Sequence, residues 1–313
     1  MDSELIELRR KKAQEWESRT QSSRSTRSRS PRRSPMETDS GPSDTLRVLS
    51  WNIDGLDENS DMEDILGRTL WVIREINRTR PHVVFLQELV ELSISIIEQQ
   101  CKNSFHVFRQ INCTQPYFVA ILVHKSTMDI VGRPEPIPFP KSVMGREGLL
   151  VTARLRNVDH LSSPISFITA HFESTREFAV ERKNQFETCW KFIQGKSSSP
   201  INNNHSFTVF GGDLNARDSD VPKILSNLDC WVLAGKPTEH QYTWDLVRNK
   251  NSVFPDGAQP RCRFDRMYVV PGTQKSVPPI KDFQLVGTEP VPNRRHASDH
   301  FGVLVEISLK SIR

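Results

Sequence analysis

The segment Leu46-Arg47-Val48-Leu49-Ser50-Trp51-Asn52-Ile53-Asp54-Gly55-Leu56 joins an apolar run to a polar, glycine-containing turn. The run 46–51 predicts a β-strand, and Asn52 and Asp54 follow it directly. Because neighbouring strands of a sheet end at a common edge, polar side chains at a strand end can meet those of other strands. The segment therefore predicts one part of a site at a sheet edge.

Four more segments repeat this arrangement further along the chain. They are Leu86–Glu88, Thr169–Arg176, Gly212–Arg217 and Ser298–His300, each at or just past the end of an apolar run or next to one. Together the five segments hold carboxylates, amides, imidazoles and guanidinium groups, an inventory that suits metal-assisted cleavage of a phosphate ester. A single tripeptide arises easily by chance, whereas five in this order indicate one active site.

The bulk composition allows one large domain or two small ones in 313 residues. A hydrophobic content of 36% with a mean hydropathy of −0.50 is typical of a soluble protein with a buried core. The formal charge of +4 gives only weak support for a polyanion partner. No apolar run approaches the roughly 18 residues of a membrane span, and the N-terminus is no secretory signal. Five cysteines without CxxC spacing predict reduced thiols in an intracellular compartment, not a disulfide framework or a zinc site.

Residues 1–44 differ in composition from the rest of the chain. Residues 8–33 contain ten Lys or Arg against two Glu, and Ser-Arg repetition runs from Ser18 to Pro35. A segment with so few apolar side chains predicts a disordered Arg/Ser-rich tail, followed by a catalytic domain over residues 45–313. The tail is interpreted either as a solvated extension or as a patch for nuclear import or nucleic-acid contact. The second interpretation predicts a nuclear location, with the cytoplasm as a further compartment.

Hydrophobic periodicity predicts an α/β sandwich. Strands and helices are interspersed, but several strands follow one another directly, which favours mixed or mostly antiparallel sheets over a parallel wound sheet. Strands are expected at 46–51, 82–87, 117–123, 149–155, 165–170, 207–210, 264–270 and 301–307, helices at 61–80, 92–101, 175–194 and 221–228, and a polar loop at 195–205.

Three pairs of polar residues carry the expected chemistry, and each has a plainer explanation. Asp54 and Glu88 offer the hard oxygen ligands that Mg²⁺ prefers, or they are a turn residue and a solvated strand end. Asp213 and Asn215 alternate around a leucine and could hold and deprotonate a water, or they form an Asx turn.

The third pair is Asp299-His300. Its aspartate could fix the imidazole or bind metal, while His300 stabilises phosphate charge. His171 is accompanied by the phosphate-binding donors Ser174 and Arg176. A histidine at a strand edge is also often structural.

Two further motifs, Tyr242-Thr243-Trp244-Asp245 and Arg263-Phe264-Asp265-Arg266, pair aromatic residues with charge. They are core aromatics at strand ends, or a platform on which nucleobases stack while arginine contacts the backbone. Tyr117 is a candidate for the same platform.

Taken together, these motifs resemble the endonuclease/exonuclease/phosphatase superfamily over about residues 45–310. That resemblance implies a four-layer α-β-β-α sandwich with a site in a cleft at one edge. Segments 51–56, 171–176, 242–245 and 263–266 are similar to members that hydrolyse the bond between a tyrosine and a 5′ DNA phosphate, left by a trapped topoisomerase II. Abasic-site nucleases share the Trp-Asn-x-Asp-Gly-Leu and Gly-Asp-Leu-Asn segments, so these two discriminate poorly.

The resemblance also implies roles for individual residues. Asp54 and Glu88 serve Mg²⁺, with Mn²⁺ as an alternative. The catalytic set is then Asn52, Asp213 and Asn215, which orient the site and activate water, and His171, Ser174 and His300, which hold the phosphate, with Asp299 supporting His300. Substrate contacts are expected from most of these residues and from Ile53, Gly55, Leu56, Tyr117, Arg146, Arg176, Ala216, Arg217, Trp244 and Phe264.

Several other functions compete with this one. The closest is an abasic-site endonuclease or 3′ exonuclease of the same superfamily. A phosphoinositide or sphingomyelin phosphodiesterase fits less well, because the aromatic and arginine motifs suit DNA and no membrane-binding segment is evident. An inactive scaffold or RNA-binding protein is disfavoured, because all five segments keep their polar residues. Vertebrate members of the subfamily carry a ubiquitin-associated domain ahead of the catalytic domain, whereas one short helix and the Arg/Ser tail precede it here, which argues against ubiquitin binding.

Overall fold

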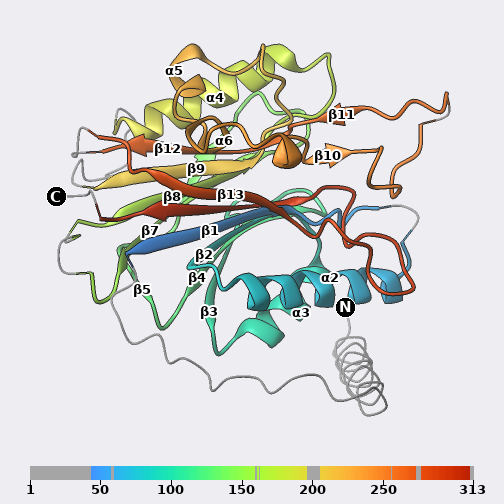
Figure 1. The fold of residues 1–313 in the computed structure, drawn as a ribbon, viewed down its shortest axis with the longest axis horizontal. Coiled ribbons are helices and arrows are strands. Elements are labelled where there is room, and N and C mark those ends of the chain that lie inside the picture. The colour runs from blue at the N-terminus through green and yellow to red at the C-terminus, as the bar shows by residue number, and fades with distance from the viewer. Residues whose placement is uncertain are drawn as a thin grey trace. The chain divides into compact units, whose positions relative to one another are not determined.

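Two six-stranded β-sheets pack face to face in the computed structural model, which describes residues 44–57, 60–158, 161, 163–195, 205–254, 256–272 and 276–310. Helices lie on the outer face of each sheet (Figure 1). This arrangement confirms the predicted four-layer α-β-β-α sandwich and its mixed sheets.

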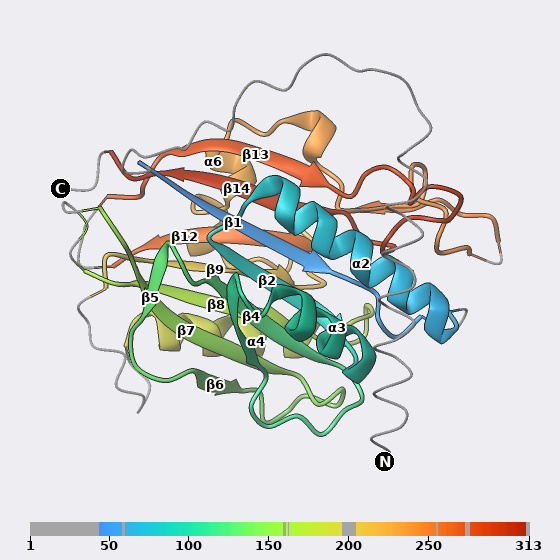
Figure 2. The ribbon, with the colours of Figure 1, turned by 90° about the horizontal axis from the view of Figure 1, so that it is seen from below.

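The first sheet has the strand order β13-β14-β1-β2-β4-β3. Strands β1 and β2 are parallel and the other neighbours are antiparallel. Helices α2 and α3 cover the outer face of this sheet (Figure 2). The bounds are β1 (Thr45–Asn52), α2 (Met62–Thr79), β2 (Val83–Leu89), α3 (Glu91–Cys101), β3 (Phe105–Arg109), β4 (Phe118–His124), β13 (Ile280–Val286) and β14 (Gly302–Ser308).

The second sheet has the order β12-β9-β8-β7-β5, and β6 also pairs with β7. Its one parallel pair is β8 and β9. The bounds are β5 (Met128–Ile130), β6 (Glu135–Pro138), β7 (Glu147–Leu155), β8 (Ile165–His171), α4 (Ala179–Ile193), β9 (Phe207–Asp213), α5 (Lys223–Ser226), α6 (Cys230–Leu233), the 3-10 helix η1 (Thr238–His240) and β12 (Asp265–Pro271), with a separate two-stranded ribbon of β10 (Trp244–Asp245) and β11 (Arg261–Cys262).

The main core lies between the two sheets. Phe85 on β2 meets Phe167 on β8 edge to face, with ring centroids 6.5 Å apart, and both side chains are fully buried. A second core under α4 packs Phe172, Phe186 and Phe210 together. Close packing of both faces of the central strands holds the strand ends in fixed positions.

The sheet topology brings the strand-end segments to one edge. Because β1 and β2 are parallel, Asn52 lies opposite Gln87 and beside Glu88, and the parallel register of β8 and β9 pairs His171 with Asp213. Strand β12 begins at the same edge, where Asp265 pairs with Asp213. The edge is the end toward which β1 points in Figure 1.

Gly211 and Gly212 are required by the close approach of neighbouring strands. A Cβ atom on Gly211 would lie 2.5 Å from the carbonyl oxygen of Arg266, and one on Gly212 would lie 2.1 Å from that of Ala170. Gly212 also has a φ of +143°, which side chains rarely allow. The glycines therefore let β8, β9 and β12 approach closely just before Asp213.

Several element predictions were wrong in extent. The helix expected at 175–194 begins only at Ala179, and the one at 221–228 is the single turn α5. Strands β3, β5, β6 and β13 were missed. The predictions for residues 1–43 and for most of the loop 195–205 lie outside the described residues. All five cysteines are free thiols, and among the described helices none has the length and apolar character to cross a bilayer.

The guanidinium of Arg68 ties together the loops that follow β1 and precede β14. Arg68 is 2% exposed and donates to the carbonyl oxygens of Ile53 (3.2 Å), Asp54 (2.9 Å) and Ala297 (3.0 Å). It also pairs with Asp64 one helical turn earlier, at 3.1 Å. Helix α2 thus fixes two of the strand-end segments through one buried side chain.

Replacing Arg68 with methionine should lower the free energy of unfolding by about 3–5 kcal/mol, because buried acceptors and a carboxylate lose their partner. Urea denaturation would measure the loss. Arg156→Met is the matched control, since Arg156 pairs with Asp129 at the surface and such pairs contribute about 0–1 kcal/mol. Equal losses in the two variants would show that Arg68 is not a structural tie.

Candidate active site

Asn52 joins the two sheets at their common edge. Its side-chain amide donates to Glu88 Oε1 and to Asp213 Oδ2, both at 2.9 Å, and Asn52 is 1% exposed. Glu88 belongs to the first sheet and Asp213 to the second. One buried amide therefore sets the spacing of two carboxylates that come from different halves of the fold.

His171 lies between the same two carboxylates. Its Nε2 atom is 3.4 Å from Asp213 Oδ2 and 3.7 Å from Glu88 Oε1, but it has no hydrogen-bond partner within the described residues. Burial, reinforced by the nearby charges of Arg146 and His300, lowers the pKa of His171 well below its ordinary value. The imidazole is therefore neutral, and because its Nδ1 atom faces the Arg146 guanidinium, which has only donors, the ring proton lies on Nε2 and can be donated to a group bound here.

A β-bulge aims the side chain of Glu88. The pairing of β2 with β4 shifts register between Leu86 and Leu89, and Glu88 has a φ of +54°. Bulges are a common way to redirect a side chain beside a site, and a left-handed glutamate is uncommon. Gly55 makes this bulge possible, because a Cβ atom there would lie 2.3 Å from the Glu88 carbonyl oxygen that its N–H contacts.

Asp54 faces other acids at this edge. Its backbone N–H donates to Asn52 Oδ1 at 3.0 Å, which fixes the turn. Burial is the main cause that raises its pKa to about 8, and the charges of Asp299 and Glu88 add to it while Arg68 opposes them. Burial also raises the pKa of Glu88. Mutually repelling carboxylates in a buried place are the environment that a divalent cation relieves.

The donor set fits a metal ion. Ligand atoms of Glu88, His171 and Asp213 all lie within 4.8 Å of one another. The buried acids of raised pKa are consistent with a cation among them. The second expected ligand, Asp54, is coupled electrostatically to Glu88 but does not belong to this trio.

The expected partner of His300 was wrong. Asp265 Oδ2 lies 2.7 Å from His300 Nδ1 in a buried pair, whereas Asp299 comes no nearer than 3.9 Å to Nε2. Asp299 instead accepts hydrogen bonds from Trp244 Nε1 and Ser252 Oγ, each at 3.0 Å. Asp265 stands in a segment that was singled out for its aromatic residue, and only the pairing of β12 with β9 brings it to His300.

The surroundings of His300 favour the protonated, positively charged form of its imidazole. Burial by itself would lower its pKa, but the carboxylates of Asp265, Asp299 and Asp213 raise it well above the ordinary value. Its Nε2 atom lies 3.8 Å from Asp213 Oδ2. Burial raises the pKa of Asp213 to about 7, with the charge of Asp265 adding to the effect and His300 opposing it.

Asn215 and Ser174 lie on the other side of Asp213. The backbone N–H of Asn215 donates to Asp213 Oδ1 at 3.0 Å, so the Asx turn considered from sequence is present. The Asn215 amide also donates to the Phe172 carbonyl (3.1 Å) and Ser174 Oγ (3.3 Å). The same residues therefore form both the Asx turn and this part of the polar site.

Tyr117 and Arg146 form a pair beside His171. The Arg146 guanidinium lies 4.6 Å over the Tyr117 ring, contacts His171 Nδ1, and donates to Ser174 Oγ at 3.4 Å. Tyr117 lies 6.3 Å from the His171 ring. The ring contacts therefore place Tyr117 with Arg146 and His171, and not with the platform that was expected to include it.

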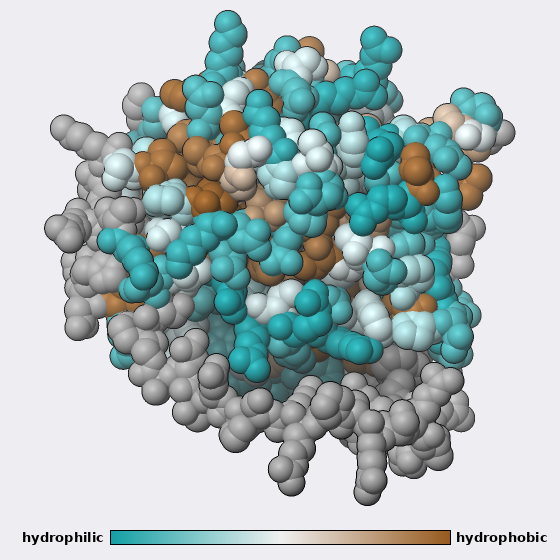
Figure 3. Space-filling model, in the orientation of Figure 1, coloured by the Kyte–Doolittle hydropathy of each residue, from teal (hydrophilic) through white to brown (hydrophobic). Residues whose placement is uncertain are grey.

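The aromatic platform consists of Trp244, Phe264 and Phe254. Trp244 lies 5.6 Å from Phe264 and 6.0 Å from Phe254, measured between ring centroids. Phe254 is 40% exposed and was missed, because it follows a polar stretch with no strand pattern. The segment between β10 and β11 projects from the fold, and Figure 3 shows apolar side chains on it.

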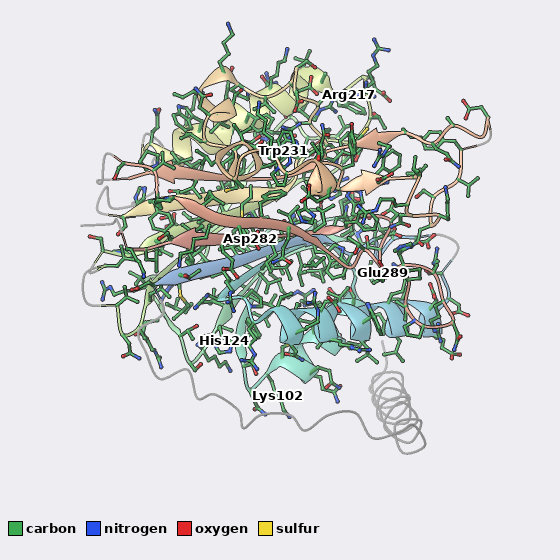
Figure 4. All side chains as sticks on the ribbon, viewed as in Figure 1. Lys102, His124, Arg217, Trp231, Asp282 and Glu289 are labelled. Carbon is green, nitrogen blue, oxygen red and sulfur yellow. The ribbon has the colours of Figure 1, made fainter. Side chains whose placement is uncertain are left out.

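The remaining predicted contacts differ in exposure. Arg176 and Arg217 are exposed, and Figure 4 shows Arg217 at the upper edge of the molecule. Leu56 is 38% exposed. Ile53 and Ala216 have buried side chains, so only their backbone can face a substrate. Substrate contacts from these two residues stay a prediction.

The sequence, the fold and this edge site define one class. The chain belongs to the endonuclease/exonuclease/phosphatase family, whose model matches residues 49–300. In sequence it is similar to the tyrosyl-DNA phosphodiesterase 2 of Xenopus tropicalis, which is 33% identical over 83% of this chain, and to that of Homo sapiens, which is 32% identical over 84%. The chain spans 65% and 68% of the length of these relatives.

A solved structure agrees with both the fold and the family. The crystal structure of D. rerio TDP2 complexed with single strand DNA product superposes with a TM-score of 0.72 and 27% identity, covering 84% of this chain and 98% of that one. These findings confirm the predicted superfamily and the predicted resemblance within it.

Replacing Asp265 with asparagine should lower the pKa of His300 toward its ordinary value, because the nearest negative charge is removed. NMR titration of the imidazole would measure this. Since the raised pKa contributes stability that is present below pH 6.5 and is lost as pH rises through the folded value, the variant should lose most stability at acid pH. Asp299→Asn is the control, and a larger shift in that variant would restore Asp299 as the partner.

Proposed function

We propose that this chain is a divalent-metal-dependent phosphodiesterase that hydrolyses the bond between a tyrosine and a 5′ DNA phosphate. The relatives' names and the DNA product in the D. rerio structure support this choice within the family. The observation that carries it is the setting of Asp213, which is held by Asn52, faced by His171 and His300, and joined to Glu88 through one amide.

Asp213 is the group best suited to take a proton from the attacking water. A base whose pKa lies near the working pH is the most effective, and burial raises that of Asp213 to about 7. Asn52 holds its Oδ2 atom and the Asn215 N–H holds Oδ1. Both carboxylate oxygens are therefore oriented before a substrate arrives, which lowers the reorganisation that the reaction requires.

The phosphate is held by donors around this carboxylate. His300 is kept protonated by its acidic neighbours, so its Nε2–H can stabilise negative charge that grows on phosphoryl oxygens. Ser174, Asn215 and Arg146 supply further donors from the opposite side. In this proposal Asp265 orients the His300 ring, and Asp299 acts through its contact with Trp244.

The metal ion of this proposal is Mg²⁺, with Mn²⁺ as an alternative. Glu88 would hold it, and Asp54 beside Glu88 would add a second carboxylate or bind one of its waters. A bound Mg²⁺ supplies Lewis-acid polarisation of a phosphoryl oxygen and neutralises charge on the phosphate. The neutral His171 next to Glu88 would donate from Nε2 to the phosphate, as its Nδ1 atom faces the Arg146 guanidinium.

DNA would extend from this centre over the aromatic platform. Stacking on an aromatic side chain contributes about 1–3 kcal/mol per base and tolerates any sequence, as a general repair activity requires. Trp244 and Phe264 were expected from sequence, and the exposed Phe254 adds a third ring. The exposed Arg176 and Arg217 would contact phosphates of the same strand.

The biological setting is part of the proposal. A 5′-phosphotyrosyl end is the product of a trapped topoisomerase II, so the substrate implies repair of DNA double-strand breaks. We place this activity in the nucleus, on the basis of the Arg/Ser composition of residues 18–35.

A side-by-side assay of 5′-phosphotyrosyl, abasic-site and 3′-recessed oligonucleotides should show release of tyrosine from the first and little cleavage of the others. EDTA should abolish the release of tyrosine, and added Mg²⁺ should restore it. Glu88→Gln should lower turnover at least about 10²-fold while the melting temperature changes little, whereas Glu91→Gln at the surface should be silent. Preferred cleavage of the abasic site would replace the proposed substrate, and full turnover in EDTA would refute the metal requirement.

A further inference from the structure

Glu173 is a fully buried carboxylate near the site that the proposed chemistry does not use. It is 0% exposed and lies two residues after His171, in the loop between β8 and α4. Its Oε1 atom accepts from the backbone N–H groups of Val143 (2.7 Å) and Met144 (2.9 Å). Ser142 Oγ donates to both carboxylate oxygens at 3.0 Å. The side chain therefore gathers the donors of one distant turn.

That turn carries one side chain of the site and supports another. Ser142 Oγ accepts from the backbone N–H of Arg146 at 2.8 Å. The carbonyl oxygen of Met144 accepts from the Tyr117 hydroxyl at 3.1 Å. Glu173 is therefore linked to both Arg146 and Tyr117, in each case through a hydrogen bond made by a residue of the turn.

Helix α4 holds Glu173 in place from the other side. Gln185 donates to Glu173 Oε2 at 2.9 Å and accepts from its backbone N–H at 3.0 Å. The Arg182 guanidinium donates to the Glu173 carbonyl oxygen at 3.0 Å. Gln185 and Arg182 are 1% and 4% exposed, so this support is shielded from solvent. A buried polar group with every donor aligned rigidifies its surroundings.

We propose that Glu173 is a positioning residue that fixes the turn 142–146, so that the Arg146 guanidinium lies against His171 and Ser174 where it contacts the substrate phosphate. The inference rests on the proposed function, since Arg146 is a substrate contact only if that function holds. Glu173 itself touches no substrate. Its effect on the reaction passes through the backbone of Ser142, Val143 and Met144.

Glu173→Gln is the sharpest change, because the chain offers no acceptable orientation for the new amide. If its NH₂ group replaces Oε1, it opposes the N–H groups of Val143 and Met144. If it replaces Oε2, it opposes the Gln185 Nε2 donor. Each orientation sets donors against donors in a buried place, at the turn in the first case and at the support from α4 in the second, so the turn should be held less firmly although the volume of the side chain is unchanged.

The test is a double-mutant cycle of Glu173→Gln and Arg146→Ala, with kcat/KM measured on a 5′-phosphotyrosyl oligonucleotide in Mg²⁺. Each single variant should lose at least about tenfold, and the double variant should lose little more than Arg146→Ala, because coupled residues are not additive. Additive losses would overturn the proposal. Glu75→Gln, at a mostly buried glutamate of α2 that pairs with Arg78, is the matched control and should leave kcat/KM unchanged.

Amide hydrogen exchange separates the positioning of the turn from the proposed function. Val143 and Met144 should exchange faster in Glu173→Gln while strands β8 and β9 keep their protection. Unchanged exchange at both amides would overturn the proposal even if activity fell. A wild-type protein that leaves the phosphotyrosyl substrate intact would refute the function instead, and the exchange result would then decide alone whether Glu173 holds the turn.

Should Glu173→Gln fail to fold, Ser142→Ala carries the same test. It removes only the hydroxyl that links the Glu173 carboxylate to the Arg146 N–H. It should lower kcat/KM in the wild-type background and have little effect in the Arg146→Ala background. An equal effect in the two backgrounds would contradict the proposal.

Discussion

The site depends on one buried amide that lies between two sheets. Asn52 ends β1 in the first sheet, and its side chain reaches Glu88 in that sheet and Asp213 in the second. Burial raises the pKa of both acids, and the charge of Asp299 at Glu88 and that of Asp265 at Asp213 add to the effect, so each acid tends to retain its proton. The amide donates to both, so it sets their distance while each remains available to a cation or a water. Any shift of one sheet against the other would break this geometry.

The fold is suited to hold such a contact. Each sheet has one parallel pair, β1 with β2 and β8 with β9, and each pair delivers two polar residues to the same edge. Antiparallel strands β12 and β14 begin there, with Asp265 as the first residue of β12 and His300 two residues before β14. Around this rigid centre, buried side chains from the outer helices hold the loops: Arg68 from α2 on the Asp54 side, and Arg182 with Gln185 from α4 on the Glu173 side. The site is therefore supported from both outer layers of the sandwich.

Much of this was predictable from the sequence because the strand patterns are strong. The strands that end in Asn52, Glu88, His171 and Asp213 are apolar enough to be recognised, and parallel neighbours must end together. Contacts that depend on strand register were not predictable, because Asp265 meets His300 only through the pairing of β12 with β9. Asp299 was predicted as the partner of His300 because the two residues are adjacent in sequence. The half-polar edge strands β3 and β13 lacked a clear alternation. Glu173 stood inside a recognised motif, but its role depends on a turn 30 residues earlier, which no spacing reveals.

The central claim is that the Asp213 carboxylate activates the attacking water and does not mainly bind substrate. The most direct measurement compares Asp213→Asn with the wild-type protein on a 5′-phosphotyrosyl oligonucleotide, with kcat from single-turnover kinetics and the dissociation constant from fluorescence anisotropy. The account predicts that kcat falls at least about 10²-fold while the dissociation constant changes little, because the amide keeps the shape of the carboxylate but cannot take a proton. An unchanged kcat, or a loss that appears only as weaker binding, would contradict it.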